Sequence, residues 1–177
     1  MKPLLIRPNF QNIPYELQDI NNWILWKSVQ RDGKETKIPW SVYGEAAKTN
    51  DPKTWGSFES AVMRYEPSTH AGIGFVFSQG CGYAGIDLDS CRNPVTLEMA
   101  DWAMEWINKF NSYTEVSPSG TGVKIWVKTN LDLTGINSKI DAPPMPGCKK
   151  KPGIEAYTKG RYFAMTGFVV RGFTNYD

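Results

Sequence analysis

The sequence predicts a mixed α+β fold in which antiparallel or mixed sheets carry helices on one side. Short apolar segments joined by Gly- and Pro-containing turns fill the second half of the chain. A single long amphipathic segment, residues 94–110, interrupts them. Strands and helices do not alternate regularly, as they do in a doubly wound fold. A length of 177 residues with 41% hydrophobic content favours one domain, residues 1–177.

Runs of β-branched and aromatic residues bounded by turn residues indicate eight strands. They are expected at residues 23–29, 37–40, 72–77, 83–89, 112–116, 123–128, 154–157 and 161–166. Asp32-Gly33 is a hairpin signal, and Pro39 favours an edge strand. Short turns predict that residues 72–89 form a hairpin, and that the strand after residues 158–160 returns beside the one before it.

Helical periodicity appears in two segments besides a short turn at residues 13–17. In residues 57–65 the apolar stripe is Phe58, Ala61, Val62 and Tyr65. In residues 94–110, which Pro94 opens, it is Met99, Ala103, Trp106, Ile107 and Phe110. Residues 130–152 are expected to be a loop. Both stripes predict packing on a core.

The composition excludes several classes of chemistry. Three cysteines without a CxxC pair and a single histidine, His70, give no plausible zinc set and little basis for His-dependent nucleophilic catalysis. No apolar run approaches the about 20 residues of a membrane span. The odd cysteine count and the lack of a recognisable signal peptide favour a reducing cytoplasm.

The stretch Gly-Tyr-Ala-Gly-Ile-Asp-Leu-Asp-Ser, residues 82–90, holds the strongest chemical signal. Alternation in a strand sends Ile86 and Leu88 to one face and both Asp87 and Asp89 to the other. Adjacent carboxylates repel, and hard divalent ions such as Mg²⁺ or Mn²⁺ hold such pairs together. The stretch is equally compatible with a solvated acidic face.

Three further features are expected beside these acids on one sheet face. The turn Ser117-Pro118-Ser119-Gly120-Thr121-Gly122 is typical of a backbone nest that binds phosphate. In residues 123–128 alternation predicts Val123, Ile125 and Val127 inside and Lys124, Trp126 and Lys128 outside. Glu155 points away from Ile154 and Ala156, and a third carboxylate suits a site for one or two divalent ions.

The ordered motifs resemble the catalytic core of phage and plasmid primase-polymerases of the archaeo-eukaryotic primase superfamily. The likeness spans residues 13–167. It rests on Gly-Ile-Asp-Leu-Asp, Tyr-Thr-Glu-Val-Ser-Pro-Ser-Gly-Thr-Gly-Val-Lys-Ile-Trp, and Ile-Glu-Ala-Tyr-Thr-Lys-Gly-Arg-Tyr-Phe-Ala-Met-Thr-Gly, preceded by Trp-Ile-Leu-Trp, Lys-Ile-Pro-Trp, Asp-Pro-Lys-Thr-Trp-Gly-Ser-Phe-Glu-Ser-Ala and Gly-Ile-Gly-Phe-Val-Phe. The resemblance implies a two-lobed core with an RNA-recognition-like sheet, divided into an N-terminal lobe (13–70) and a metal- and nucleotide-binding core (71–167).

The resemblance also implies residue roles. Asp87, Asp89 and Glu155 match the catalytic, metal-binding acids. Ser117, Ser119, Gly120, Lys124 and, more loosely, Arg161 match nucleotide-contacting positions. The expected partners are single-stranded DNA template and primer, an NTP or dNTP, and a helicase domain or protein, in a phage, plasmid or prophage replication system. Lys124 stands where the superfamily usually has histidine, which puts proton transfer at that position in doubt.

Three other functions fit part of the pattern. A catalytically silent module that binds single-stranded DNA or nucleotide would use Trp126, Tyr157 and Tyr162 as stacking platforms. A metal-dependent nuclease would use the same acids, although the Ser-Pro-Ser-Gly-Thr-Gly turn argues against it. A sugar-nucleotide transferase would explain only the two aspartates.

Overall fold

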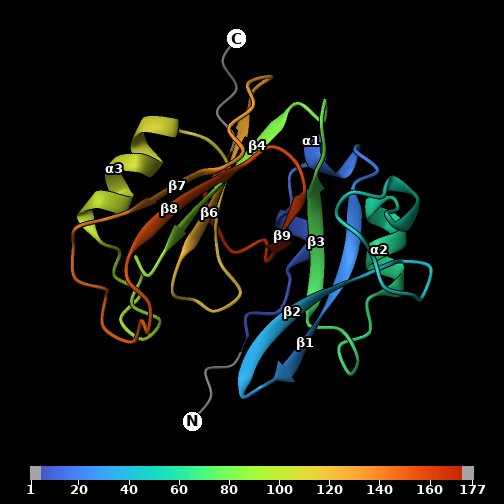
Figure 1. The fold of residues 1–177 in the computed structure, drawn as a ribbon, viewed down its shortest axis with the longest axis horizontal. Helices are drawn as coiled ribbons and strands as arrows, with labels where there is room; N and C mark the ends of the chain where they lie inside the picture. Colours follow the sequence, from blue (N-terminus) through green and yellow to red (C-terminus); the bar gives the residue numbers. More distant parts are fainter. Residues whose placement is uncertain (1–4, 173–177) are drawn as a thin grey trace.

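The computed structural model describes residues 5–172, which form two antiparallel sheets with the two longer helices on their outer flanks (Figure 1). The first sheet has the order β2 (Lys34–Trp40), β1 (Trp23–Arg31), β3 (Gly72–Phe77), β9 (Arg161–Met165). The second has the order β10 (Val169–Arg171), β5 (Thr114–Val116), β6 (Val123–Lys128), β4 (Tyr83–Asp89), β8 (Gly153–Tyr157), β7 (Ile136–Lys139). The mixed α+β class is confirmed.

Three α-helices and two 3₁₀ turns complete the described part of the chain. They are η1 (Phe10–Asn12), α1 (Tyr15–Gln18), η2 (Pro52–Thr54), α2 (Phe58–Arg64) and α3 (Asp101–Phe110). Helix α3 begins seven residues later than predicted, because the Asn93 side chain accepts hydrogen bonds from the backbone N–H groups of Val95 and Thr96 and closes a turn there. No helix among residues 5–172 is long and apolar enough to cross a membrane.

Both predicted returns between consecutive strands are wrong. Strand β3 pairs with β1 and β9, whereas β4 pairs with β6 and β8, so residues 72–89 cross from one sheet to the other. Side chains of β3 and β4 instead pack against one another between the sheets, where the Phe75 and Tyr83 rings meet edge-on with centroids 6.4 Å apart. Strand β9 likewise leaves β8 and joins the first sheet. The predicted loop 130–152 contains the edge strand β7.

The sheets also interleave along the chain. Strands β3 and β9 lie after residue 71, yet they complete the sheet begun by β1 and β2. The expected lobe boundary at residues 70/71 therefore does not coincide with a boundary between sheets. Edge position of β2, which carries Pro39, agrees with the prediction from that proline.

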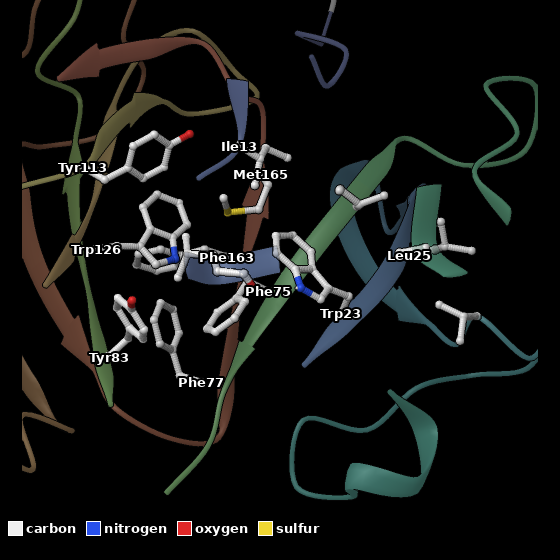
Figure 2. Packing of buried hydrophobic residues seen from close by; sticks show 14 residues of the cluster. Ile13, Trp23, Leu25, Phe75, Phe77, Tyr83, Tyr113, Trp126, Phe163 and Met165 are labelled. Carbon is white, nitrogen blue, oxygen red and sulfur yellow. Dashed lines mark hydrogen bonds between the residues drawn. The ribbon is translucent and has the colours of Figure 1, made fainter. Parts of the chain in front are cut away.

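An aromatic layer joins the two sheets (Figure 2). Phe163 of β9 packs edge-on against Phe77 and Trp126, with ring centroids 4.9 and 5.2 Å apart. Gly85 of β4 makes this approach possible, since a Cβ there would lie 2.4 Å from the Phe77 ring and 2.5 Å from the Phe163 ring. Trp126 is fully buried in this layer. The expectation of an outward, exposed Trp126 is wrong, because the first sheet covers that face of β6.

The opposite face of the second sheet packs on α3. Ile86 and Leu88 of β4, with neighbours from β6 and β8, form a separate core with Ala103 and Ile107. The alternation predicted for residues 83–89 is therefore confirmed. It leaves Asp87 and Asp89 on the face turned away from α3, which we call the acidic face.

Candidate active site

Five side chains form a row across five adjacent strands of the second sheet. The register aligns Glu115 of β5, Lys124 of β6, Asp87 of β4, Glu155 of β8 and Asn137 of β7. Directly opposed residues of an antiparallel sheet share a face, with Cβ atoms about 4.5–5.5 Å apart. Strands far apart in the sequence thus bring together Asp87, Lys124 and Glu155.

Lys124 and Asp87 form an ion pair at the centre of this row. Lys124 Nζ lies 2.8 Å from Asp87 Oδ2, and the two side chains are 8% and 20% exposed. The same ammonium lies 4.1 Å from the centroid of the Phe163 ring. The aromatic layer and the acid therefore hold Lys124 on the acidic face, as the alternation of residues 123–128 predicts.

Asp89 lies two residues beyond Asp87 on the same strand, opposite Gly153. Burial raises the pKa of Asp89, and the Asp87 carboxylate raises it further, while the charges of Lys150 and Lys124 act against this. The two carboxylates therefore repel one another. This is the electrostatic situation that a bound cation relieves.

Glu155 is placed in the row but its carboxylate is engaged on the β7 side. It accepts a hydrogen bond from Asn137 Nδ2 at 3.1 Å and another from the Tyr157 hydroxyl. Because Asp87 is paired with Lys124, the three predicted ligands have different immediate partners. Among residues 5–172 no group of three or more His, Cys, Asp or Glu side chains is arranged to hold a metal ion.

The donor set nevertheless suits a hard divalent ion. Carboxylate oxygens are the ligands that Mg²⁺ and Mn²⁺ prefer. Asp87, Asp89 and Glu155 share one face of the sheet, because Asp87 is directly opposed to Glu155 and Asp89 lies two residues beyond Asp87. Binding of such an ion at Asp87 Oδ2 and at the Glu155 oxygen bonded to Tyr157 would compete with the Lys124 ammonium and the Tyr157 hydroxyl.

The turn at residues 117–122 lies close to Asp89. A Cβ at Gly122 would lie 2.5 Å from the carbonyl oxygen of Leu88, so glycine is needed for this approach. The backbone N–H groups of Gly120 and Gly122 donate to the Ser117 carbonyl and hydroxyl oxygens. The predicted backbone nest would need free N–H groups to bind phosphate, and these two amides are already used within the turn. The turn instead presents a chain of hydroxyls, in which Ser119 Oγ lies 3.1 Å from Ser117 Oγ and 2.8 Å from Thr121 Oγ1.

Arg161 is exposed at the start of β9 and does not join the row. Its guanidinium lies 5.4 Å from the Tyr157 ring centroid, and the Tyr157 hydroxyl contacts Glu155. Arg161 is therefore linked to the acidic face through one intervening side chain.

Three charged residues at this site were not predicted. Arg92 Nη1 donates to the Gly120 carbonyl at 2.9 Å and braces the turn. Glu115 is fully buried beside Lys124. The sequence feature that could have indicated its role is a carboxylate inside a short β-prone run. Lys37 comes from β2 of the other sheet, and no local pattern connects it with the acids.

Lys37 is within electrostatic range of the acidic face. Its pKa is lowered to about 8, chiefly by desolvation and also by the charge of Lys124, whereas Asp87 and Asp89 act in the opposite direction. The residue as a whole is exposed, while its ammonium lies over the Trp26 ring, 5.3 Å from the ring centroid. Lys37 thus adds a positive charge from the first sheet to the surroundings of the acids of the second.

Comparison with known proteins gives one informative similarity. No family model matches the chain. The chain is similar to a phage DNA primase-polymerase. That protein, from Nitratiruptor phage NrS-1, is 33% identical over 155 residues, which cover 85% of this chain and 20% of the phage protein. The chain therefore spans about a fifth of the length of the curated relative that it matches.

Proposed function

We propose that this chain is the nucleotidyltransferase core of a DNA primase-polymerase of the archaeo-eukaryotic primase superfamily. It would transfer a nucleotidyl group from an NTP or dNTP to a 3′-hydroxyl on a single-stranded DNA template. The observation that carries the proposal is the row that aligns Lys124, Asp87 and Glu155 in a chain similar to a phage primase-polymerase.

The carboxylates of Asp87, Asp89 and Glu155 would bind Mg²⁺ or Mn²⁺. A divalent ion held there would neutralise the negative charge that develops when an oxygen attacks the α-phosphate. The chain's own part is to hold three carboxylates on one face of a rigid sheet. The raised pKa of Asp89 indicates that this charge concentration is costly without a cation.

Positive and hydroxyl groups around the acids would bind the triphosphate. Lys124 offers a point charge next to Asp87, and it becomes available to a phosphate oxygen once Asp87 is engaged elsewhere. The hydroxyls of Ser117 and Ser119 can donate to phosphate oxygens from the turn that Gly120 closes. Arg161, out beyond Tyr157, would contact template or primer phosphate.

The proposal also covers the cellular location and the partner of the protein. The chain would act in the cytoplasm of a bacterial host as part of a phage, plasmid or prophage replication system. A helicase domain or protein is the proposed partner, as the resemblance to phage and plasmid primase-polymerases implies.

The test is extension of a labelled primer on a single-stranded template with Mg²⁺ or Mn²⁺ and nucleotides. We expect extension by the unaltered protein and none by Asp87→Ala/Asp89→Ala, with circular dichroism showing that the variant remains folded. Lys128→Met, an exposed position on β6, is the matched control and should extend normally. Full extension by the double variant would refute the metal-binding role of the aspartates.

A second function, a catalytically silent nucleotide- or DNA-binding module, is favoured by one observation. Lys124 already neutralises Asp87, as a permanent structural ion pair would. The result that would identify this second function is template binding, measured by gel shift, that Asp87→Ala/Asp89→Ala does not change. No variant would extend the primer. Metal-dependent shortening of the primer would indicate a nuclease instead.

A further inference from the structure

Glu115 is a buried carboxylate to which the proposed chemistry assigns no role. It is fully inaccessible to solvent on β5. Its oxygens accept hydrogen bonds from the Tyr113 hydroxyl at 2.7 Å, from the backbone N–H of Thr166 at 2.6 Å and from that of Gly167 at 2.9 Å. Three donors therefore fix the carboxylate in one orientation.

These bonds connect the two sheets. Thr166 and Gly167 directly follow β9 of the first sheet, whereas Glu115 belongs to the second. The Thr166 hydroxyl adds a further bond to the carbonyl oxygen of Val116 at 2.7 Å. The end of β9, the strand that also carries Phe163 over Lys124, is thus anchored to β5 through Glu115.

Glu115 is also the direct neighbour of Lys124 in the row. In register Lys124 therefore has a carboxylate on each side, Asp87 on β4 and Glu115 on β5, and it is the Asp87 carboxylate that forms the ion pair with its ammonium, at 2.8 Å. The Lys124 charge interacts favourably with Glu115, because it lowers the pKa that burial has raised. Burying a carboxyl group is costly, and an apolar residue would pack here at less cost, so a carboxyl group at this position suits a purpose beyond packing.

We propose that Glu115 is a positioning residue that holds the Lys124 ammonium in the row when Asp87 is engaged with a cation. The inference rests on the proposed function of the acidic face. Lys124 is bonded to Oδ2 of Asp87, and a divalent ion drawn to that oxygen would compete with the ammonium for it. Glu115 is the remaining negative partner in register, and its own anchors at residues 113, 166 and 167 prevent it from following Lys124 elsewhere.

A double-mutant cycle on nucleotide affinity tests this. The variants are Glu115→Gln, Lys124→Met and the combination, and the measured quantity is the Kd of dATP with Mn²⁺ by calorimetry at pH 8. We expect Glu115→Gln to weaken binding about tenfold in the unaltered background and less than about twofold in the Lys124→Met background. An equal loss in both backgrounds would mean that Glu115 acts only through stability and would overturn the proposal.

Thr114→Val is the matched control. Thr114 is equally buried on the adjacent position of β5, faces the other way and donates to the Ser112 carbonyl oxygen at 2.9 Å. It should lower the melting temperature without changing the Kd of dATP. Loss of dATP affinity in this variant as large as in Glu115→Gln would count against a specific role for Glu115.

A second measurement needs neither nucleotide nor metal. Lysine NH₃⁺ groups held in stable ion pairs exchange slowly and give resolved ¹⁵N signals by NMR. In Asp87→Asn we expect the Lys124 signal to persist, and in Asp87→Asn/Glu115→Gln to be lost. Persistence in both would overturn the proposal. Failure of the unaltered protein to bind dATP would count against the proposed function alone, because the NMR result stands without it.

Discussion

Lys124 of β6 and Asp87 of β4 are directly opposed across the sheet, and their charged atoms are 2.8 Å apart. The pair occupies the centre of a row that continues to Glu115 on one side and Glu155 on the other. Its ammonium is in direct contact with one of the acids that the proposed function assigns to metal binding. Metal binding and release of Lys124 should therefore be coupled.

Lys124→Met should change the affinities for Mn²⁺ and for dATP in opposite directions. Without the competing ammonium, we expect Mn²⁺ to bind the nucleotide-free protein roughly three- to tenfold more tightly, or about 1 kcal/mol. The affinity for dATP should fall, because a phosphate contact is lost. Calorimetric titrations with Mn²⁺ and then with dATP measure both changes. Weaker binding of Mn²⁺ would contradict competition between the ammonium and the cation.

Glu115 should make the stability of the fold depend on pH. Burial raises its pKa from 4.5 to about 7, so the folded state binds a proton between these values that the unfolded state has released. The free energy of unfolding should therefore fall as pH rises from about 4.5 to 7, by up to about 3 kcal/mol, and level off above that range.

The measurement is urea unfolding of the unaltered protein and of Glu115→Gln between pH 4.5 and 8. The raised pKa of Asp89 acts in the same direction in both proteins, so the difference between their curves isolates Glu115. Parallel curves would show that Glu115 does not titrate in this range.

Lys37→Arg should alter the pH dependence of nucleotide binding. Because desolvation lowers the pKa of Lys37 to about 8, its charge is largely lost between pH 7 and 9. Affinity for dATP with Mg²⁺ should fall across that interval in the unaltered protein and less steeply in Lys37→Arg, since the guanidinium remains charged. Lys34→Arg, an exposed position on the same strand, is the control. An identical profile for all three proteins would place Lys37 outside the nucleotide site.

Gly85→Ala should destabilise the packing between the two sheets. The new methyl group would lie 2.4–2.5 Å from the rings of Phe77 and Phe163, and these rings pack within the shared aromatic layer. We expect a loss of about 1–3 kcal/mol in the free energy of unfolding, measured by urea denaturation. Gly172→Ala, where nothing lies within 4 Å of the added carbon, should be close to neutral. A stable Gly85→Ala protein would mean that the layer can shift.

Local patterns predicted much of the fold because they report on nearest neighbours. Alternation in residues 83–89 placed Ile86 and Leu88 against α3 and the two aspartates on the other face. The Asp32-Gly33 turn correctly joined β1 to β2. Pairing partners beyond such a turn were not predictable, and both β3 and β9 were assigned to the wrong neighbours. Strand pairing depends on packing between distant segments, whose signal is spread over many residues.

The sequence by itself determined which side chains of a strand share a face, such as Asp87 with Asp89, and that Lys124 and Glu155 point away from the apolar side of their own strands. Only the tertiary structure decided that these strands are neighbours and what their common face meets. It buried Trp126 under the first sheet, added Glu115 to the row and brought Lys37 toward the acids. The reason is physical: alternation is fixed by backbone geometry, residue by residue, whereas the packing of two sheets is decided by the shape of the whole aromatic layer between them.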